Sequence, residues 1–192
     1  MQKQVSKAHY QFSSYVQKSR WASLWHQLDE VISQQPGRVL EIGPGPGLFK
    51  AAARTVGVLV ETLDIDPELN PDHVGSALAM PFADASYDVV CAFQMLEHLP
   101  WDDGRQAFRE MVRVAGKAVV VSLPDAAVRW RYTVHVPMVG TLQWLIPKPA
   151  LRRPVHQFDG EHYWEINKAG FPLRRIKGEF FASPDVVLER TY

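Results

Sequence analysis

Three glycines alternate with two prolines in the sequence GPGPG at residues 43–47, directly after the stretch VLEI. Glycine lets the backbone approach a ligand closely, because it carries no Cβ. Proline has no backbone N–H, so this loop offers few donors to a phosphate group. Leu48 also stands where the dinucleotide fingerprint Gly-x-Gly-x-x-Gly requires its third glycine. The loop therefore predicts a ligand site that does not hold a pyrophosphate.

An acidic residue follows at the spacing that suits a ribose. The apolar run that starts at Val58 ends in Asp64, about twenty residues after the loop. Doubly wound folds place an acid on the ribose hydroxyls at this distance from the glycine loop. Loop and acid together predict a nucleoside ligand. Alternatively, Asp64 caps the next element of the chain.

The elements that must position these residues alternate between strands and helices. Helical spacing of apolar residues runs from about 8 to 34 and ends at Pro36-Gly37. The further elements that we expect are strands at 38–42, 58–63, 74–76, 87–93 and 117–123, with helices at about 46–55 and 102–114. This rhythm is typical of a parallel sheet with helical crossovers, whose ligands bind at the carboxyl ends of the strands.

The alternation stops after Pro124. A proline-containing tract fills 124–158, and a helix is expected near 160–169. The runs 173–181 and 185–192 are separated by three residues and predict an antiparallel hairpin at the sheet edge. The predicted fold is a doubly wound α/β sheet of seven mostly parallel strands, with helices on both faces and this C-terminal hairpin.

We predict a single domain over 1–192, with an N-terminal helical cap at 1–35 and an acceptor-side insertion at 124–158. The chain of 192 residues is long enough for one well-buried core. Basic and acidic residues balance at 21 each, which argues against a nucleic-acid partner. No signal peptide or membrane-spanning run is evident, so a cytoplasmic protein is expected. Cys91 lies in an apolar run and predicts a buried small side chain.

Four segments, in this order, carry a family resemblance: VLEIGPGPGLF, ETLDIDPEL, GSALAMPFADASYDVV and QMLEHL. Together they look like a class I S-adenosylmethionine-dependent methyltransferase, over residues 38–123. HYWEINKAGFPL at 162–173 resembles the last helix of that family before its terminal hairpin. The resemblance implies a Rossmann-like methyltransferase fold and S-adenosyl-L-methionine as the cofactor.

The resemblance also implies roles for individual residues. Gly43, Gly45 and Gly47 correspond to the loop under the methionine and ribose of the cofactor, and Glu41 to a residue near its amino group. Asp64, with Ile65 beside it, corresponds to the ribose site.

Other residues correspond to the two ends of the cofactor. Ser76, Ala77 and Leu78 match the adenine pocket, where many relatives carry an acid at the position of Ser76; this chain departs from them there. Gln94 matches a residue near the sulfonium. Tyr15 and Arg20 resemble residues that cover the cofactor in some relatives.

Methyl transfer from a sulfonium needs alignment and exclusion of water more than a dedicated catalytic group. An acceptor that must lose a proton would need a base, and His98, His156 and His162 are candidates. Each of them can instead be a structural histidine. No metal site is predicted from the sequence.

The acceptor expected from the sequence is a small molecule, a lipid-like molecule or a glycan-linked group. The insertion places an apolar tract containing Trp144 between basic residues, a pattern compatible with peripheral membrane contact or with an ordinary core cap. The alternatives are a non-catalytic S-adenosylmethionine-binding partner or regulatory protein, a protein or RNA methylase, and a nicotinamide dehydrogenase. The oligomeric state is left open.

Overall fold

The computed structural model describes residues 18–148, 154–158, 160–183 and 186–191. A parallel sheet lies at its centre, with the strand order β3-β2-β1-β4-β5. Its strands are β1 (Val39–Ile42), β2 (Val60–Asp64), β3 (His73–Val74), β4 (Tyr87–Phe93) and β5 (Ala115–Ser122). Because β1 lies between β2 and β4, the strand order reverses beside it, as in doubly wound folds.

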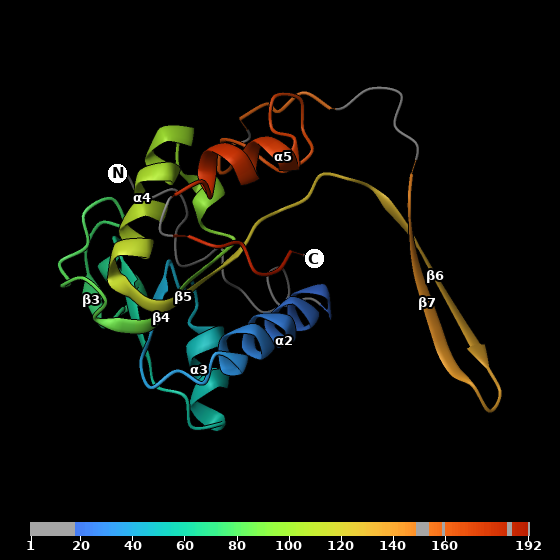
Figure 1. Ribbon diagram of the computed structural model, residues 1–192, viewed down its shortest axis with the longest axis horizontal. Coiled ribbons are helices and arrows are strands. Elements are labelled where there is room, and N and C mark those ends of the chain that lie inside the picture. The colour runs from blue at the N-terminus through green and yellow to red at the C-terminus, as the bar shows by residue number, and fades with distance from the viewer. Residues whose placement is uncertain (1–17, 149–153, 159, 184–185, 192) are drawn as a thin grey trace.

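Helices cover both faces of this sheet (Figure 1). On one face, α2 (Lys18–Ser33) and α3 (Leu48–Thr55) pack over Val39 and Cys91. On the other face, α4 (Trp101–Val114) packs over Leu40 and Val90, together with residues from the end of the chain. Neighbouring residues of a strand point to opposite faces, and this alternation divides the core into two layers.

The predicted elements of the first 123 residues are confirmed, with shifts of one or two residues at their ends. The helix predicted near 102–114 begins at Trp101, and β4 has the predicted bounds. Two short 3-10 turns were not predicted, η2 (Pro67–Leu69) and η3 (Leu96–His98). Residues 1–17, including the first part of the predicted helical cap, lie outside the described residues.

The helix predicted near 160–169 is wrong. This segment has no helical residue, and its backbone N–H groups bond to distant carbonyls, Tyr163 to Glu97 at 2.9 Å and Ile166 to Pro124 at 3.1 Å. Trp164 is fully buried, and its Nε1–H donates to the carbonyl oxygen of Leu99 at 3.1 Å. Tertiary packing of one large ring therefore outweighs the local helical preference of the segment.

The hairpin predicted at 173–192 is also wrong in its position. Residues 173–180 are helical, as α5 (Leu173–Arg175) and the π-helical turn η4 (Ile176–Phe180), and the described residues beyond 180 form no strand. Leu173, Ile176 and Phe180 follow helical spacing, and the last two are buried. The main sheet consequently has five strands in the described part of the chain, where seven were predicted.

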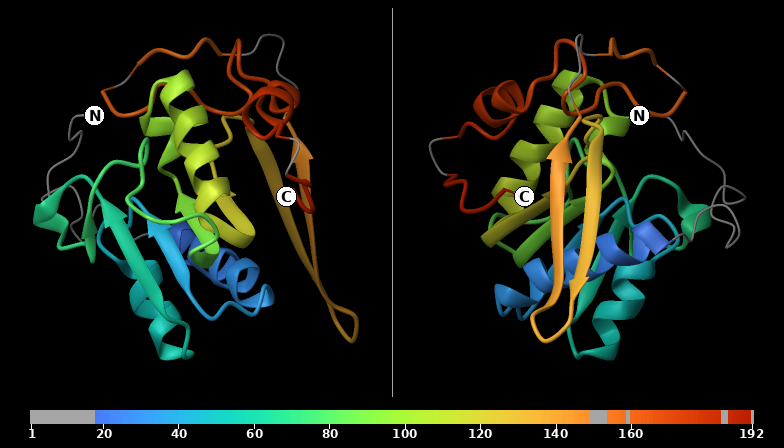
Figure 2. Two further views of the ribbon diagram at one scale, coloured as in Figure 1. Left: turned by 60° about the vertical axis from the view of Figure 1, so that its left-hand side comes forward. Right: turned by 90° about the vertical axis from the view of Figure 1, so that its right-hand side faces the viewer.

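An antiparallel hairpin does form, but within the 124–158 insertion. β6 (Arg129–Val136) pairs with β7 (Gly140–Pro147), and the two strands make a separate sheet. Figures 1 and 2 show this ribbon standing away from the central sheet and its helices. The helical cap that the apolar tract could have formed is therefore not present.

One face of the hairpin is apolar and exposed. The cross-strand pairs Trp130 with Ile146, Tyr132 with Trp144 and Val134 with Leu142 place six apolar side chains on one side. Each of these side chains is between 40% and 49% exposed. No helix in the described part of the chain has both the length and the hydropathy to cross a membrane.

We expect Trp164→Ala to lower the free energy of unfolding by about 3–5 kcal/mol, because it removes a buried ring and leaves a cavity. Trp144→Ala, on the exposed face of the hairpin, is the matched control and should cost less than about 1 kcal/mol. Urea denaturation of both variants measures the difference. Equal losses would show that the hairpin carries as much of the folding energy as the core.

Candidate functional site

Three loops meet at the carboxyl edge of the parallel sheet. Ile42 at the end of β1 is paired in register with Leu63 of β2 and Ala92 of β4. Gly43 follows β1, Asp64 ends β2 and Gln94 follows β4, so these three residues lie at the same edge of the sheet. The structure brings together the residues that the sequence analysis assigned to one ligand.

The glycine loop depends on backbone conformations that other residues adopt at a cost. Gly43, Gly45 and Gly47 have φ angles of 65°, 53° and 74°. A Cβ added at Gly43 would lie 2.5 Å from Cγ of Met95, so the loop packs directly on that side chain. A Cβ at Gly47 would meet open space. Pro46 lies in the turn before α3 and not in the first helical turn where it was expected, because the helix begins at Leu48.

Glu41 lies in β1, the central strand of the sheet, two residues before this loop. Its side chain is 3% exposed, and its Oε2 has no hydrogen-bond partner among the described residues. Burial raises the pKa of Glu41 to about 8, although the charge and the backbone N–H of Lys50 oppose the shift. Its neighbours on the adjacent strands are Thr62 and Cys91. An unsatisfied buried carboxyl group is costly unless a ligand supplies its partner.

Cys91 is a free, fully buried cysteine, as the sequence predicted. Burial, with a smaller contribution from the charge of Glu41, raises the pKa of its thiol well above the usual value. The thiol is therefore uncharged at neutral pH and packs as a small apolar side chain.

Asp64 ends β2 at the same edge and is partly buried. Its Oδ1 accepts a hydrogen bond from the backbone N–H of Asp66 at 2.8 Å. The alternative that Asp64 caps the next element is wrong, because the N-cap of η2 is Asp66, whose side chain accepts from the backbone N–H of Glu68 at 3.0 Å. Burial raises the pKa of the Asp64 carboxyl group. The hydrogen bond from Asp66 does not prevent Asp64 from binding a ligand, because a carboxylate has about four acceptor sites. Ile65, the next residue, is half-buried.

Ser76, Ala77 and Leu78 follow β3 in a turn. The hydroxyl oxygen of Ser76 accepts from the backbone N–H of Leu78 at 3.1 Å. Ala77 is buried in the core, and Leu78 packs against it in part. The Ser76 hydroxyl thus holds its own turn, and its O–H remains a donor for another acceptor.

Gln94 has an unusual backbone for a residue that is not glycine. Its φ angle is 54°, and its backbone N–H donates to the carbonyl oxygen of Ser122 at 3.0 Å. Residues in the left-handed region cost of order 1–3 kcal/mol and are concentrated at functional sites. Among the residues expected to cover the cofactor, Arg20 lies half-buried in α2, and Tyr15 lies outside the described residues.

The structure brings together two of the three candidate histidines. His98 in η3 and His162 have their ring centroids 4.8 Å apart. His156 is held away from a catalytic role, since its Nε2 contacts the carbonyl oxygen of His162 at 2.8 Å and its Nδ1 contacts Nζ of Lys168 at 3.3 Å.

The structure also identifies a residue that the sequence analysis did not assign. Glu97, next to His98, is fully buried, and neither of its carboxyl oxygens has a hydrogen-bond partner among the described residues. Burial raises its pKa to about 8. The available signal was an acid inside the apolar sequence Met95-Leu96-Glu97, which lies in a turn that sequence patterns do not predict.

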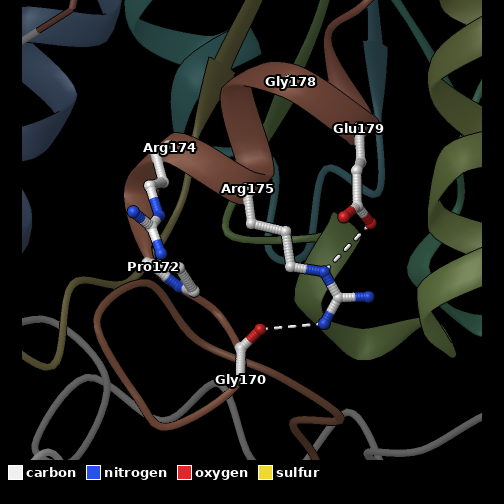
Figure 3. Close-up of a pocket in the computed structure, with 6 residues that line it drawn as sticks. All are labelled: Gly170, Pro172, Arg174, Arg175, Gly178 and Glu179. Carbon is white, nitrogen blue, oxygen red and sulfur yellow. Dashed lines mark hydrogen bonds and ion pairs between the residues drawn. The ribbon is translucent and has the colours of Figure 1, made fainter.

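A separate pocket of about 550 Å³ lies beside α5 and η4 (Figure 3). Its lining includes Arg174, Arg175 and Glu179. Arg175 is engaged, because its Nε donates to Oε2 of Glu179 at 2.9 Å and its Nη1 to the carbonyl oxygen of Gly170 at 2.8 Å. None of the cofactor residues predicted from the sequence lines this pocket.

Comparison with known proteins gives a family match for the central part of the chain. Residues 40–121 match the family model described as a methyltransferase domain. Curated relatives named uncharacterized methyltransferases include one from Mycobacterium sp. (strain KMS), 33% identical over 115 residues. That match covers 52% of this chain and 43% of the relative. A second, from Mycobacterium marinum, is 33% identical over 96 residues and covers 43% of this chain and 37% of the relative.

The chain thus spans less than half the length of these curated relatives. Among solved structures, the PH0226 protein from Pyrococcus horikoshii has a TM-score of 0.49 at 15% identity, covering 74% of this chain and 84% of that one. The YcgJ protein from Bacillus subtilis has a TM-score of 0.41 at 26% identity, covering 52% and 51%. The family match rests on the sequence comparisons.

We expect the stability of the protein to fall as pH rises from about 4.5 to about 8, because the folded state keeps Glu41 protonated where the unfolded chain does not. The contribution of Glu41 to the free energy of unfolding is fully present below the pKa of glutamate in the unfolded chain and is lost as the pH rises to its pKa in the folded protein. Between these two values the free energy of unfolding falls by up to about 1.4 kcal/mol per pH unit. Glu97 acts in the same direction.

Glu41→Gln should make this slope shallower, and Glu189→Gln, at an exposed position, should leave it unchanged. Urea denaturation at a series of pH values between about 5 and 8 gives the slopes. An unchanged slope in Glu41→Gln would contradict the raised pKa.

Proposed function

We propose that this chain, whose residues 40–121 match the methyltransferase-domain family model, binds S-adenosyl-L-methionine at the carboxyl edge of its sheet and transfers the methyl group to an acceptor. The observation that carries the proposal is Glu41, a buried residue of β1 with an unsatisfied carboxyl oxygen, two residues before the glycine loop. The amino group of the cofactor is a cation with N–H donors and would satisfy this oxygen. The residues present therefore fit the cofactor.

The glycine loop and Asp64 would hold the middle of the cofactor. Positive φ angles at Gly43, Gly45 and Gly47 keep side chains off the loop, so that the methionine and ribose can lie against its backbone. The partly buried carboxylate of Asp64 would accept from the ribose hydroxyls while it also accepts from the backbone N–H of Asp66. Ile65 would pack beside the ribose.

Ser76, Ala77 and Leu78 would form the adenine side. The Ser76 hydroxyl already accepts from Leu78, so the adenine amino group would meet a weaker acceptor here than the acid that many relatives carry. Gln94 would stand near the sulfonium, where its left-handed backbone turns the chain at the end of β4. Arg20 in α2 and Tyr15 would cover the bound cofactor.

The cofactor supplies an activated methyl group, and the chain would align the acceptor with it and exclude water. If the acceptor oxygen or nitrogen must lose a proton, His98 and His162 would be the candidate bases. His98 lies four residues after Gln94 in the sequence, and the ring of His162 is next to that of His98. His156 is a weaker candidate, because both of its ring nitrogens contact neighbouring groups.

We further propose that the acceptor is a small or lipid-like molecule, with an apolar part that the face of the β6–β7 hairpin would contact. Support comes from the six exposed apolar side chains on that face, which include Trp130, Tyr132 and Trp144. Exposed apolar patches of this kind are typical of interaction sites. The same face would account for peripheral contact with a membrane surface, and a glycan-linked acceptor could stack on its aromatic rings.

We expect Asp64→Ala to weaken the binding of S-adenosylmethionine by about 10- to 150-fold, since it removes a charge-assisted hydrogen bond of about 1.5–3 kcal/mol. Asp125→Ala, at the base of the hairpin, should bind the cofactor as the parent does. Calorimetry with S-adenosylmethionine and with NAD makes the comparison. Tight NAD binding without S-adenosylmethionine binding would overturn the proposed function, and unchanged affinity in a folded Asp64→Ala variant would overturn the ribose assignment alone.

Binding of S-adenosylmethionine should strengthen from about pH 6 to about pH 7.5, by up to tenfold per pH unit, because Glu41 must lose its proton to pair with the amino group. The charged group facing Glu41 is Lys50, and the neighbouring thiol of Cys91 stays neutral. Calorimetry in buffers of different ionisation enthalpy should detect proton release on binding at about pH 7. Glu41→Gln should bind more weakly and without proton release; release that persists in this variant would exclude Glu41 as its source.

A further inference from the structure

Glu97 is buried in the apolar core and lacks a hydrogen-bond partner for either oxygen among the described residues. It lies in η3, between Leu96 and His98, and Leu96 is fully buried beside it. Protonation alone does not satisfy such a group, because its O–H would still need an acceptor. A carboxyl group in this setting calls for a partner that the chain does not supply.

Two imidazoles lie beside this carboxyl group. Ligand atoms of Glu97, His98 and His162 are all within 4.8 Å of one another. The two segments that carry them are joined by a backbone hydrogen bond from the N–H of Tyr163 to the carbonyl oxygen of Glu97, 2.9 Å long. The grouping is therefore built into the packing of the chain and does not depend on mobile surface side chains.

Each imidazole is oriented by an oxygen atom at its Nδ1. His98 Nδ1 lies 3.0 Å from the carbonyl oxygen of Glu161, and His162 Nδ1 lies 3.1 Å from Oε1 of Glu165. A carbonyl oxygen can only accept, so Nδ1 of His98 carries the proton, and a carboxylate favours the same tautomer for His162. Histidine ligands of metals are usually held in this way, with the Nε2 lone pair directed at the ion.

The charges around these three residues are compatible with a bound cation. Lys168 Nζ lies 2.9 Å from Oε1 of Glu165 and thereby balances that carboxylate. Glu97 takes part in no ion pair that involves the described residues, and Glu165 acts on it only as a second negative charge. A divalent ion would offset the ionised Glu97 and supply the partner that its oxygens lack.

We propose that Glu97, His98 and His162 form a binding site for a divalent first-row transition-metal ion. One carboxylate and two imidazoles are ligands that Zn²⁺, Fe²⁺, Co²⁺ and Mn²⁺ accept, and three protein ligands leave positions open for water. Ligands of one such ion lie about 3.4 Å apart at bond lengths near 2.1 Å, so binding would draw the three atoms, now within 4.8 Å of one another, together by up to about 1.4 Å. Glu165 and the Glu161 carbonyl group position the two rings. The site is separate from the residues assigned to S-adenosylmethionine, but it uses the two imidazoles named above as candidate bases. With the ion bound, His98 and His162 are ligands and do not accept a proton from the acceptor.

The test uses the full chain, stripped with a chelator and freed of any histidine tag, and Co²⁺ as the probe. We expect the parent protein to bind one equivalent, with visible absorption bands from a site that contains nitrogen and oxygen ligands. Glu97→Gln, which keeps the shape of the side chain and removes the negative charge, should lower the affinity at least about tenfold. His162→Ala should do the same, and Glu165→Gln should have a smaller effect through the orientation of His162.

His135→Ala is the matched control, because His135 lies on the exposed hairpin and contacts Thr141. It should bind Co²⁺ as the parent does. Thermal unfolding of each variant without metal shows whether it is folded, and calorimetry with S-adenosylmethionine tests cofactor binding independently of the metal. No stoichiometric Co²⁺ binding by the folded parent, or equal binding by parent and Glu97→Gln, would overturn the metal site whatever the cofactor result.

Discussion

Parallel pairing of β1 with both β2 and β4 is the constraint on which the candidate site depends. The register that joins Ile42 to Leu63 and to Ala92 brings three loops from distant parts of the sequence to one edge of the sheet. No one of these loops makes the site alone. The glycine loop has few backbone N–H donors, and Oδ1 of Asp64 already accepts from the backbone N–H of Asp66. Gln94 has a positive φ angle, a backbone conformation that is costly for a residue other than glycine. Crossover helices on both faces hold this register, because they bury the two sides of β1 in separate core layers.

Two buried glutamate side chains distinguish the chemistry of this edge from the apolar core around it. Glu41 lies two residues before the glycine loop on the α2–α3 face, and Glu97 lies beyond the end of β4 in the layer of α4 and Trp164. Both have a pKa raised to about 8 by burial, and each retains at least one oxygen without a partner among the described residues. A core selected for stability alone would place apolar side chains at such positions. In the proposed function the amino group of the cofactor would supply a partner for Glu41, and in the proposed metal site a divalent ion would do so for Glu97.

The described part of the chain after residue 160 packs against η3 and does not form the hairpin predicted at the sheet edge. Trp164 inserts into the core and donates to Leu99, which holds the segment 160–166 against η3 and brings His162 next to His98. The apolar residues of the insertion instead pair across β6 and β7 and stay exposed. Residues 160–166 therefore support the site from within the core, whereas the β6–β7 hairpin projects from the central sheet and its helices.

The sequence by itself determined the parallel α/β architecture of residues 18–123, because the hydrophobic periodicity, the turn residues and the glycine positions all agree there. Through the family resemblance it also predicted cofactor roles for Glu41, the three glycines, Asp64 and Gln94, and the structure places Gly43, Asp64 and Gln94 at one edge of the sheet. Only the tertiary structure decided the conformation of 160–183, where the burial of Trp164, Ile176 and Phe180 in the core outweighed the patterns that predicted a helix and a hairpin. It alone revealed Glu97 beside His98 and His162, because 63 residues separate Glu161 from its hydrogen-bond partner His98, and no local pattern records a contact over that distance.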